Sequence, residues 1–191
     1  MPAKSVKELI ALARTGLGEL NYGSGLAGTA NHLAGELFKS MAGLNIVRIP
    51  FKGTGPTVTA IIGGQVQLMF GNASATAPHI TAGRLRSLAV ASLQPSPLFP
   101  GLPTVAANLP GFEAGSMNGL FAPAKTPVAI IRKLNQVVAR FPRAVETRAR
   151  LLSNGLEAVG NSPDEFAATI KSEIARLGKV ISDVGIREGQ E

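Results

Sequence analysis

The residues best placed to bind a ligand are small and uncharged, and they follow a short apolar stretch near the N-terminus. Residues 20–29 read Leu-Asn-Tyr-Gly-Ser-Gly-Leu-Ala-Gly-Thr, and an amphipathic helix is predicted directly after them. A glycine-rich turn that opens a helix presents free backbone N–H groups and the positive end of the helix dipole. No Lys, Arg or Asp stands beside these donors in the sequence. The pattern predicts a site that holds a small anion with backbone and hydroxyl groups, without chemistry.

Small polar residues recur after the next two predicted strands. Thr54 follows the second strand, and Asn72 and Ser74 follow the third. The carboxyl ends of parallel strands meet at one edge of a sheet, where such folds bind ligands. An alternative interpretation is that these residues are ordinary helix caps and turn formers. We predict a neutral, donor-rich pocket at this edge, lined by Ser24, Gly25, Gly28, Thr29, Asn72 and Ser74.

Residues 23–28 also match the dinucleotide-binding pattern G-x-G-x-x-G between a strand and a helix. That fingerprint requires an acidic residue about 20 positions later. Residues 49–52 read Ile-Pro-Phe-Lys and supply no carboxylate. Arg48 or Lys52 could favour a 2′-phosphate, so an NADP-binding, Rossmann-like oxidoreductase module is the alternative function. Our main prediction is that no nucleotide and no other cofactor binds.

The sequence offers few residues for catalysis or metal binding. It contains no Cys, and its two His residues lack the spacing of metal ligands. Glu36 is the sole acidic residue between Leu20 and Phe112, so this region has no carboxylate pair for acid–base catalysis. We expect His32, one turn into its helix, to bond a nearby backbone group. The chain is therefore not expected to be an enzyme.

The composition indicates a folded chain without a nucleic-acid site. Of the 191 residues, 45% are hydrophobic and 16% are charged, which is enough apolar material for a core. The net charge of +7 comes from scattered Lys and Arg residues, and residues 140–150 are predicted to form a solvated helix face. There is no Trp on which bases could stack. No apolar run approaches the length of a membrane span, and no apolar stretch typical of a signal peptide follows Met1. If Met1 is the true start of the protein, we expect the chain to stay in the cytoplasm.

Predicted strands and helices alternate along the first half of the chain. Helices are expected at 5–14, 29–42, 54–62 and 75–82, and strands at 19–22, 45–49, 65–70 and 86–91. This alternation predicts an α/β fold with a parallel sheet. A proline-rich loop spans 94–110, and the remainder is mostly helical with one short strand at 156–160. Capping boxes are predicted at Ser5 and Ser162. The last helix carries an apolar stripe that needs a partner, namely Phe166, Ile170, Ile174, Leu177, Ile181 and Val184.

A set of short segments is spread along most of the chain: residues 20–24 (LNYGS), 28–29 (GT), 32–38 (HLAGELF), 49–53 (IPFKG), 63–66 (GGQV), 102–105 (LPTV) and 119–123 (GLFAP). Together these segments resemble the Bug family, the periplasmic solute receptors of tripartite tricarboxylate transporters. The resemblance runs from Pro2 to Gly185. It implies a type II periplasmic-binding-protein-like fold with two lobes that close over a small carboxylated molecule, and partner subunits in the membrane.

The resemblance also implies a domain organisation. Residues 2–116 correspond to a largely complete α/β second lobe with the glycine-rich ligand loop, and residues 117–191 to the C-terminal helical part of the first lobe. Family members carry a signal peptide and most of the first lobe before the point where this chain begins. We therefore interpret the chain as an N-terminally truncated, extracytoplasmic solute-binding protein. It is periplasmic by resemblance, and cytoplasmic if its start is correct. A non-binding relic or interaction fragment is a further alternative.

The implied truncation predicts incomplete burial of the C-terminal helices. Their apolar stripes would pack on a sheet for which only residues 119–122 and 156–160 remain as strands. Bare apolar patches are association sites. We therefore expect the chain to self-associate through its exposed C-terminal helices.

Overall fold

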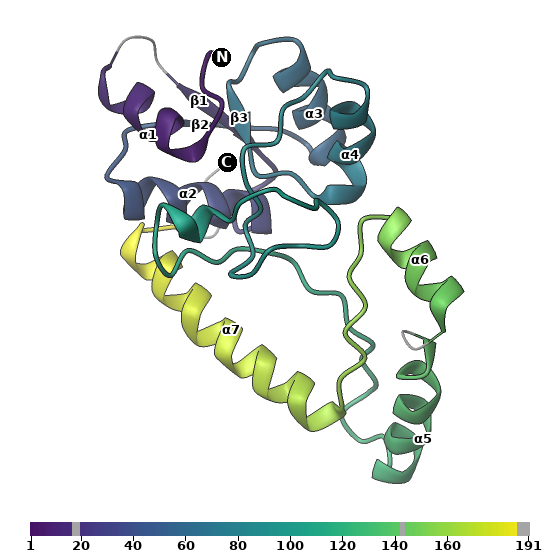
Figure 1. The fold of residues 1–191 in the computed structure, drawn as a ribbon. Helices are drawn as coiled ribbons and strands as arrows, with labels where there is room; N and C mark the ends of the chain where they lie inside the picture. The colour runs from purple at the N-terminus through teal and green to yellow at the C-terminus, as the bar shows by residue number, and fades with distance from the viewer. Residues whose placement is uncertain (17–19, 142–143, 187–191) are drawn as a thin grey trace.

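The computed structural model describes residues 1–16, 20–141 and 144–186, and its N-terminal part is a small parallel sheet surrounded by helices (Figure 1). The strands are β1 (Asn21–Ser24), β2 (Val47–Pro50) and β3 (Leu68–Met69), in the order β2-β1-β3. Both pairs are parallel, and Tyr22 of β1 lies opposite Arg48 and Leu68. The predicted α/β class is confirmed. Glu19, at the start of the predicted first strand, lies outside the described residues.

Four helices alternate with these strands, as the sequence predicts. They are α1 (Val6–Arg14), α2 (Ala30–Ala42), α3 (Thr54–Ile62) and α4 (Ala73–Thr81). Ser5 caps α1 by accepting a hydrogen bond from the N–H of Glu8. The Glu8 carboxylate accepts from the N–H of Lys4 and not from Ser5, so only half of the predicted capping box forms. Helix α2 ends at Gly43, whose φ of +62° favours glycine.

The core of this part is built from aromatic rings and one close helix–strand contact. Phe38, Phe70 and Phe112 form a ring cluster with centroids 5.7–6.2 Å apart. At Gly35, a Cβ atom would lie 2.2 Å from Cε2 of Tyr22, so only glycine lets α2 pack this closely on β1. The remaining residues of the buried cluster are Ala3, Val6, Leu9, Leu20, Ala42, Leu44, Ile46, Leu68 and Val105.

The prediction of a strand at 86–91 is wrong. Val90 alone pairs, in an isolated parallel bridge with Thr104, just before the 3₁₀ helix η1 (Val105–Ala107). The partner residue follows Pro103, which has no N–H to extend a ladder. The predicted strand at 65–70 is likewise reduced to Leu68–Met69.

The C-terminal part consists of three helices on extended connections (Figure 1). They are α5 (Val128–Val138), α6 (Val145–Ser153) and α7 (Pro163–Asp183). The capping box at Ser162 is confirmed, with Glu165 as its partner. Residues 119–122 and 156–160 are both described and form no strand, because no strand within the described ranges lies beside them to pair with.

Helix α7 connects the two parts of the molecule. It runs back from the C-terminal part and packs its last turns against α2 (Figure 1). Val180 is buried there, and Nη1 of Arg176 donates to the Glu113 carbonyl at 2.5 Å. Leu177 faces α2 across a small cavity. The predicted domain boundary near residue 116 stays a prediction.

Apolar side chains of the C-terminal part are largely exposed to solvent. No residue of α5 or α6 is buried, and Val145 is 85% exposed. Within the described ranges, no helix combines the length and hydropathy that crossing a bilayer requires. The other exposed large apolar residues beyond position 116 are Met117, Leu120, Phe121, Val128, Ile130, Leu134, Val137, Val138, Phe141, Leu156, Val159 and Ile174.

Candidate ligand-binding site

The turns after β1 and β3 lie at the same edge of the sheet. These two strands are neighbours and parallel, so the chain leaves both in the same direction. The Nδ2 atom of Asn31, in the first turn of α2, donates to the Phe70 carbonyl at 2.7 Å. This bond ties the start of α2 to the end of β3, two residues before Asn72. The structure thus brings the two predicted ligand loops together.

The six predicted site residues are not equally accessible. Ser24 is fully buried and Gly25 is buried, whereas Gly28, Asn72 and Ser74 are exposed and Thr29 is half-buried. Ser24 and Gly25 therefore support the turn from inside. The other four residues are at least partly open to solvent. Their part in ligand binding stays a prediction.

The starts of α2 and α4 lack the side-chain cap that α1 and α7 have. The Thr29 hydroxyl donates to the Leu26 carbonyl at 2.8 Å and does not cap α2. Asn72 makes no cap bond at α4. Ser5 and Ser162, in contrast, both cap their helices. Two residues with the right chemistry for capping thus leave the first N–H groups of their helices without a side-chain acceptor.

The sequence-based expectation that no basic side chain stands beside the turn is wrong. Arg48 donates from Nε to Ser24 Oγ and from Nη2 to the Gly25 carbonyl, both at 2.8 Å. It comes from β2, where it lies opposite Tyr22, and its length carries it to the end of β1. This position of Arg48 depends on how β2 pairs with β1. The spacing of residues along one strand does not reveal that pairing. Because two of its N–H donors are bonded within the protein, Arg48 stabilises the turn.

His32 bonds the backbone, as predicted. Its Nδ1 atom accepts from the N–H of Gly28 at 3.0 Å. Burial, and secondarily the positive charge of Arg48, lower the pKa of His32. The imidazole is therefore neutral, and it holds Gly28 in the left-handed conformation, φ +77°, that opens α2.

Glu36 is committed to a buried interaction with Tyr22. The Tyr22 hydroxyl donates to Glu36 Oε1 at 2.5 Å, and Lys39 Nζ lies 3.0 Å from both carboxylate oxygens. Burial and the Glu36 carboxylate raise the pKa of Tyr22. Among the residues that the structure describes, no three His, Asp or Glu side chains gather as a metal site would require.

Two hollows lie near this edge. One, of about 130 Å³, lies between α2 and the last turns of α7. Gly28 and Leu177 are among its lining residues, together with residues 113–115. The other, of about 260 Å³, is a mainly apolar groove between α3 and α4, with His79 and Arg84 at its wall. Of the six predicted residues, Gly28 alone lines either hollow.

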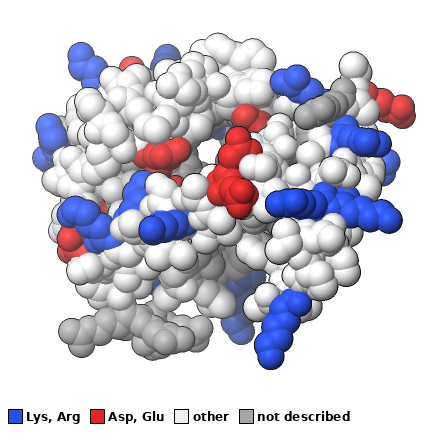
Figure 2. Space-filling view, turned by 90° about the horizontal axis from the view of Figure 1, so that it is seen from below, with Lys and Arg blue, Asp and Glu red and all other residues white. Residues whose placement is uncertain are grey.

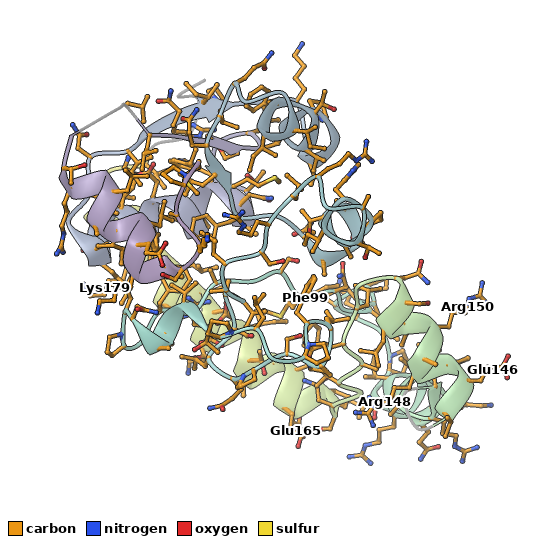
Figure 3. The ribbon with its side chains drawn as sticks, turned by 45° about the horizontal axis from the view of Figure 1, so that its top comes forward. Phe99, Glu146, Arg148, Arg150, Glu165 and Lys179 are labelled. Carbon is orange, nitrogen blue, oxygen red and sulfur yellow. The ribbon has the colours of Figure 1, made fainter. Side chains whose placement is uncertain are left out.

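The face of the molecule seen in Figure 2 carries no concentrated basic patch among the described residues. In Figure 2, Lys and Arg side chains are spread over the face seen from below, with Asp and Glu side chains between them. Figure 3 shows Glu146, Arg148 and Arg150 of α6 pointing outward. Both arginines are exposed, so the predicted solvated helix face around residues 140–150 is confirmed for them.

Comparison with known proteins identifies the family. The family model described as the tripartite tricarboxylate transporter family receptor matches residues 1–186. The chain belongs to this family. The Bug resemblance seen in the sequence is thereby confirmed, since a Bug protein of Bordetella pertussis is among its relatives. Members of this family are solute-binding receptors and not enzymes. The oxidoreductase alternative is not favoured.

Individual relatives show how much of a receptor this chain represents. It is 32% identical over 189 residues to the UPF0065 protein in the tcbD-tcbE intergenic region of Pseudomonas sp. strain P51, covering 98% of this chain and 56% of the relative. The structure of R. palustris Rpa4515 with adipate is 38% identical, with a TM-score of 0.87 over 97% of this chain and 62% of that one. MatC from Rhodopseudomonas palustris with bound malate is 28% identical, with a TM-score of 0.73 over 94% and 63%. The chain thus spans about half to two thirds of the length of these proteins.

Proposed function

We propose that this chain binds a small carboxylated solute at the carboxyl edge of its sheet. The observation that carries the proposal is that Thr29 and Asn72, at the starts of α2 after β1 and α4 after β3, have side chains suited to capping and make no cap bond. Helix starts attract anions because their N–H groups and dipole are positive. Because Thr29 and Asn72 make no cap bond, no capping side chain competes with a ligand for these N–H groups. Two starts at one edge suit a solute with two carboxylates.

Family membership supports the same class of ligand. Adipate and malate, the compounds in the two structures compared above, are both small dicarboxylates. We extend the family role to this chain as that of a receptor for a tripartite tricarboxylate-type uptake system. Its place of work is then the periplasm, and its partners are the membrane subunits of that system.

The test is a calorimetric titration with adipate and with malate. We expect saturable binding to the unmodified chain. Thr29→Asp should weaken binding about tenfold or more, which is about 1.4 kcal/mol, because the new carboxylate caps α2 and repels an anion. Ser5→Asp is the matched control, since it adds the same charge at the capped start of α1 and should leave binding unchanged. Absence of saturable binding with both compounds, or equal effects of the two substitutions, would refute the proposal.

A further inference from the structure

The turn that follows α6 lies directly on the start of α4. A Cβ atom at Gly155 would lie 2.3 Å from the backbone nitrogen of Ser74 and 2.8 Å from its Cα. Gly155 also has a φ of +72°, in the left-handed region. Both facts require a residue without a side chain. The backbone of this turn therefore covers the N–H of Ser74, in the first turn of α4.

Helix dipoles favour this contact. The N–H of Gly155 donates to the Leu152 carbonyl, and that of Leu156 to the Leu151 carbonyl, so α6 ends at this turn. Figure 1 shows this end of α6 lying nearest to α4. The negative end of one helix thus approaches the positive end of another, which is an attractive arrangement.

A second contact holds the same segment two residues later. The Ser96 hydroxyl, in the proline-rich loop, donates to Oε1 of Glu157. Ser96 Oγ also accepts from the N–H of Leu98 at 3.2 Å, and Ser96 is only 9% exposed. The donor is thus fixed in place by the loop. Glu157 is therefore anchored to the α/β part of the molecule.

We propose that residues 154–157 form a cover over the start of α4, latched by the hydrogen bond between Ser96 and Glu157. A carboxylate that binds at the start of α4 must displace this cover. At the start of α2, Gly28 instead lines the hollow of about 130 Å³ between α2 and α7. Glu157 is then a positioning residue whose bond to Ser96 sets the affinity for the solute. This last step rests on the proposed function, whereas the cover itself does not.

The cover is tested by distance measurement between spin labels on Ser40→Cys in α2 and Ser153→Cys in α6. Both positions are exposed, and the chain has no other cysteine to label. We expect a narrow distance distribution in the otherwise unmodified chain. Ser96→Ala and Glu157→Ala should each broaden it, whereas Glu157→Gln should keep it narrow because its amide oxygen still accepts from Ser96. An unchanged distribution in both alanine variants would overturn the cover.

A measurement with added adipate tests the cover and the proposed function separately. If the solute displaces the cover, adipate should broaden the distribution as Glu157→Ala does, and Glu157→Ala should bind adipate several-fold more tightly than Glu157→Gln. Equal affinity of both variants would overturn the coupling. If the alanine variants broaden the distribution but adipate does not bind, the cover stands and the proposed function fails.

Discussion

The N-terminal and C-terminal parts of this molecule have similar apolar patterns and opposite degrees of burial. In the α/β part, Phe38 and Phe112 are at most 2% exposed. Beyond position 116, Val180 is the one buried apolar side chain among the described residues, and Phe121 is 72% exposed. Amphipathic spacing shows that a helix has an apolar face, but coverage of that face depends on which other elements are present. The chain spans 62% of the length of the similar R. palustris Rpa4515 structure.

The largest expected effect is a contrast in protease resistance and association. We predict that residues 2–116 survive limited proteolysis while sites in α5 and α6 are cut early, because exposed helices with few buried contacts open readily. We also predict that the chain self-associates through this exposed surface, with a sedimentation coefficient that rises with concentration. A concentration-independent monomer whose C-terminal helices resist cleavage as long as the α/β part would contradict both expectations.

A matched pair of phenylalanine substitutions comes next. Phe112→Ala should cost about 3–5 kcal/mol of unfolding free energy, because it empties a buried ring cluster. Phe121→Ala should cost much less, since this ring is mostly in solvent and contacts Phe166 alone among the aromatic residues described. Urea denaturation followed by Tyr22 fluorescence is a suitable measurement, because Tyr22 is the sole tyrosine and there is no Trp. Equal costs would show that Phe121 is buried in solution.

Substitutions at two helical glycines test the same difference in packing between the N-terminal and C-terminal parts. Gly35→Ala should destabilise the α/β part by about 1–3 kcal/mol, because the new methyl group meets the Tyr22 ring. Gly178→Ala in α7 has open space around it and should stabilise that helix by up to about 1 kcal/mol. Thermal unfolding by circular dichroism would measure both. A neutral Gly35→Ala variant would show that α2 does not pack on β1 as described.

The smallest effect is a pH dependence confined to the α/β part. The pKa of His32 is lowered in the folded chain, so between that pKa and about 6.5 the unfolded state binds more protons than the folded state. Stability should therefore be complete above about pH 6.5 and fall as the pH drops below it. Urea midpoints read from Tyr22 fluorescence should show this slope, and His32→Gln should flatten it. If the urea midpoint changes with pH equally in the unmodified chain and in His32→Gln, the pH dependence comes from groups other than His32.

Local sequence patterns predicted the helices well. Residues 30–42 form α2 as the apolar spacing and Gly43 indicate, and Ser162 caps α7 as expected. These features depend on neighbours within one or two turns, so a sequence contains them directly. The edge that carries the glycine-rich turn was predictable for the same reason, since strand–helix alternation fixes the parallel direction.

Features that depend on distant pairing were missed. Arg48 reaches Ser24 from the neighbouring strand, and Gly155 meets Ser74 although the two are far apart in the sequence. The strand expected at 86–91 depends on a partner, and the residues that approach it follow a proline. Residue types alone do not show which distant residues come to lie opposite one another. The predicted site therefore included Ser24 as a ligand contact, although the structure buries it behind Arg48.

The packing of α7 on α2 has a consequence for biosynthesis. Val180 and Arg176 contact elements that are made much earlier, α2 and residue 113. Loops closed over such separations form late and slowly. While the ribosome is still adding residues 117–175, the outer face of α2 has no cover and the nascent chain exposes it to chaperones and to other chains. The face of α2 that α7 covers therefore stays open until residues 176–180 have been translated.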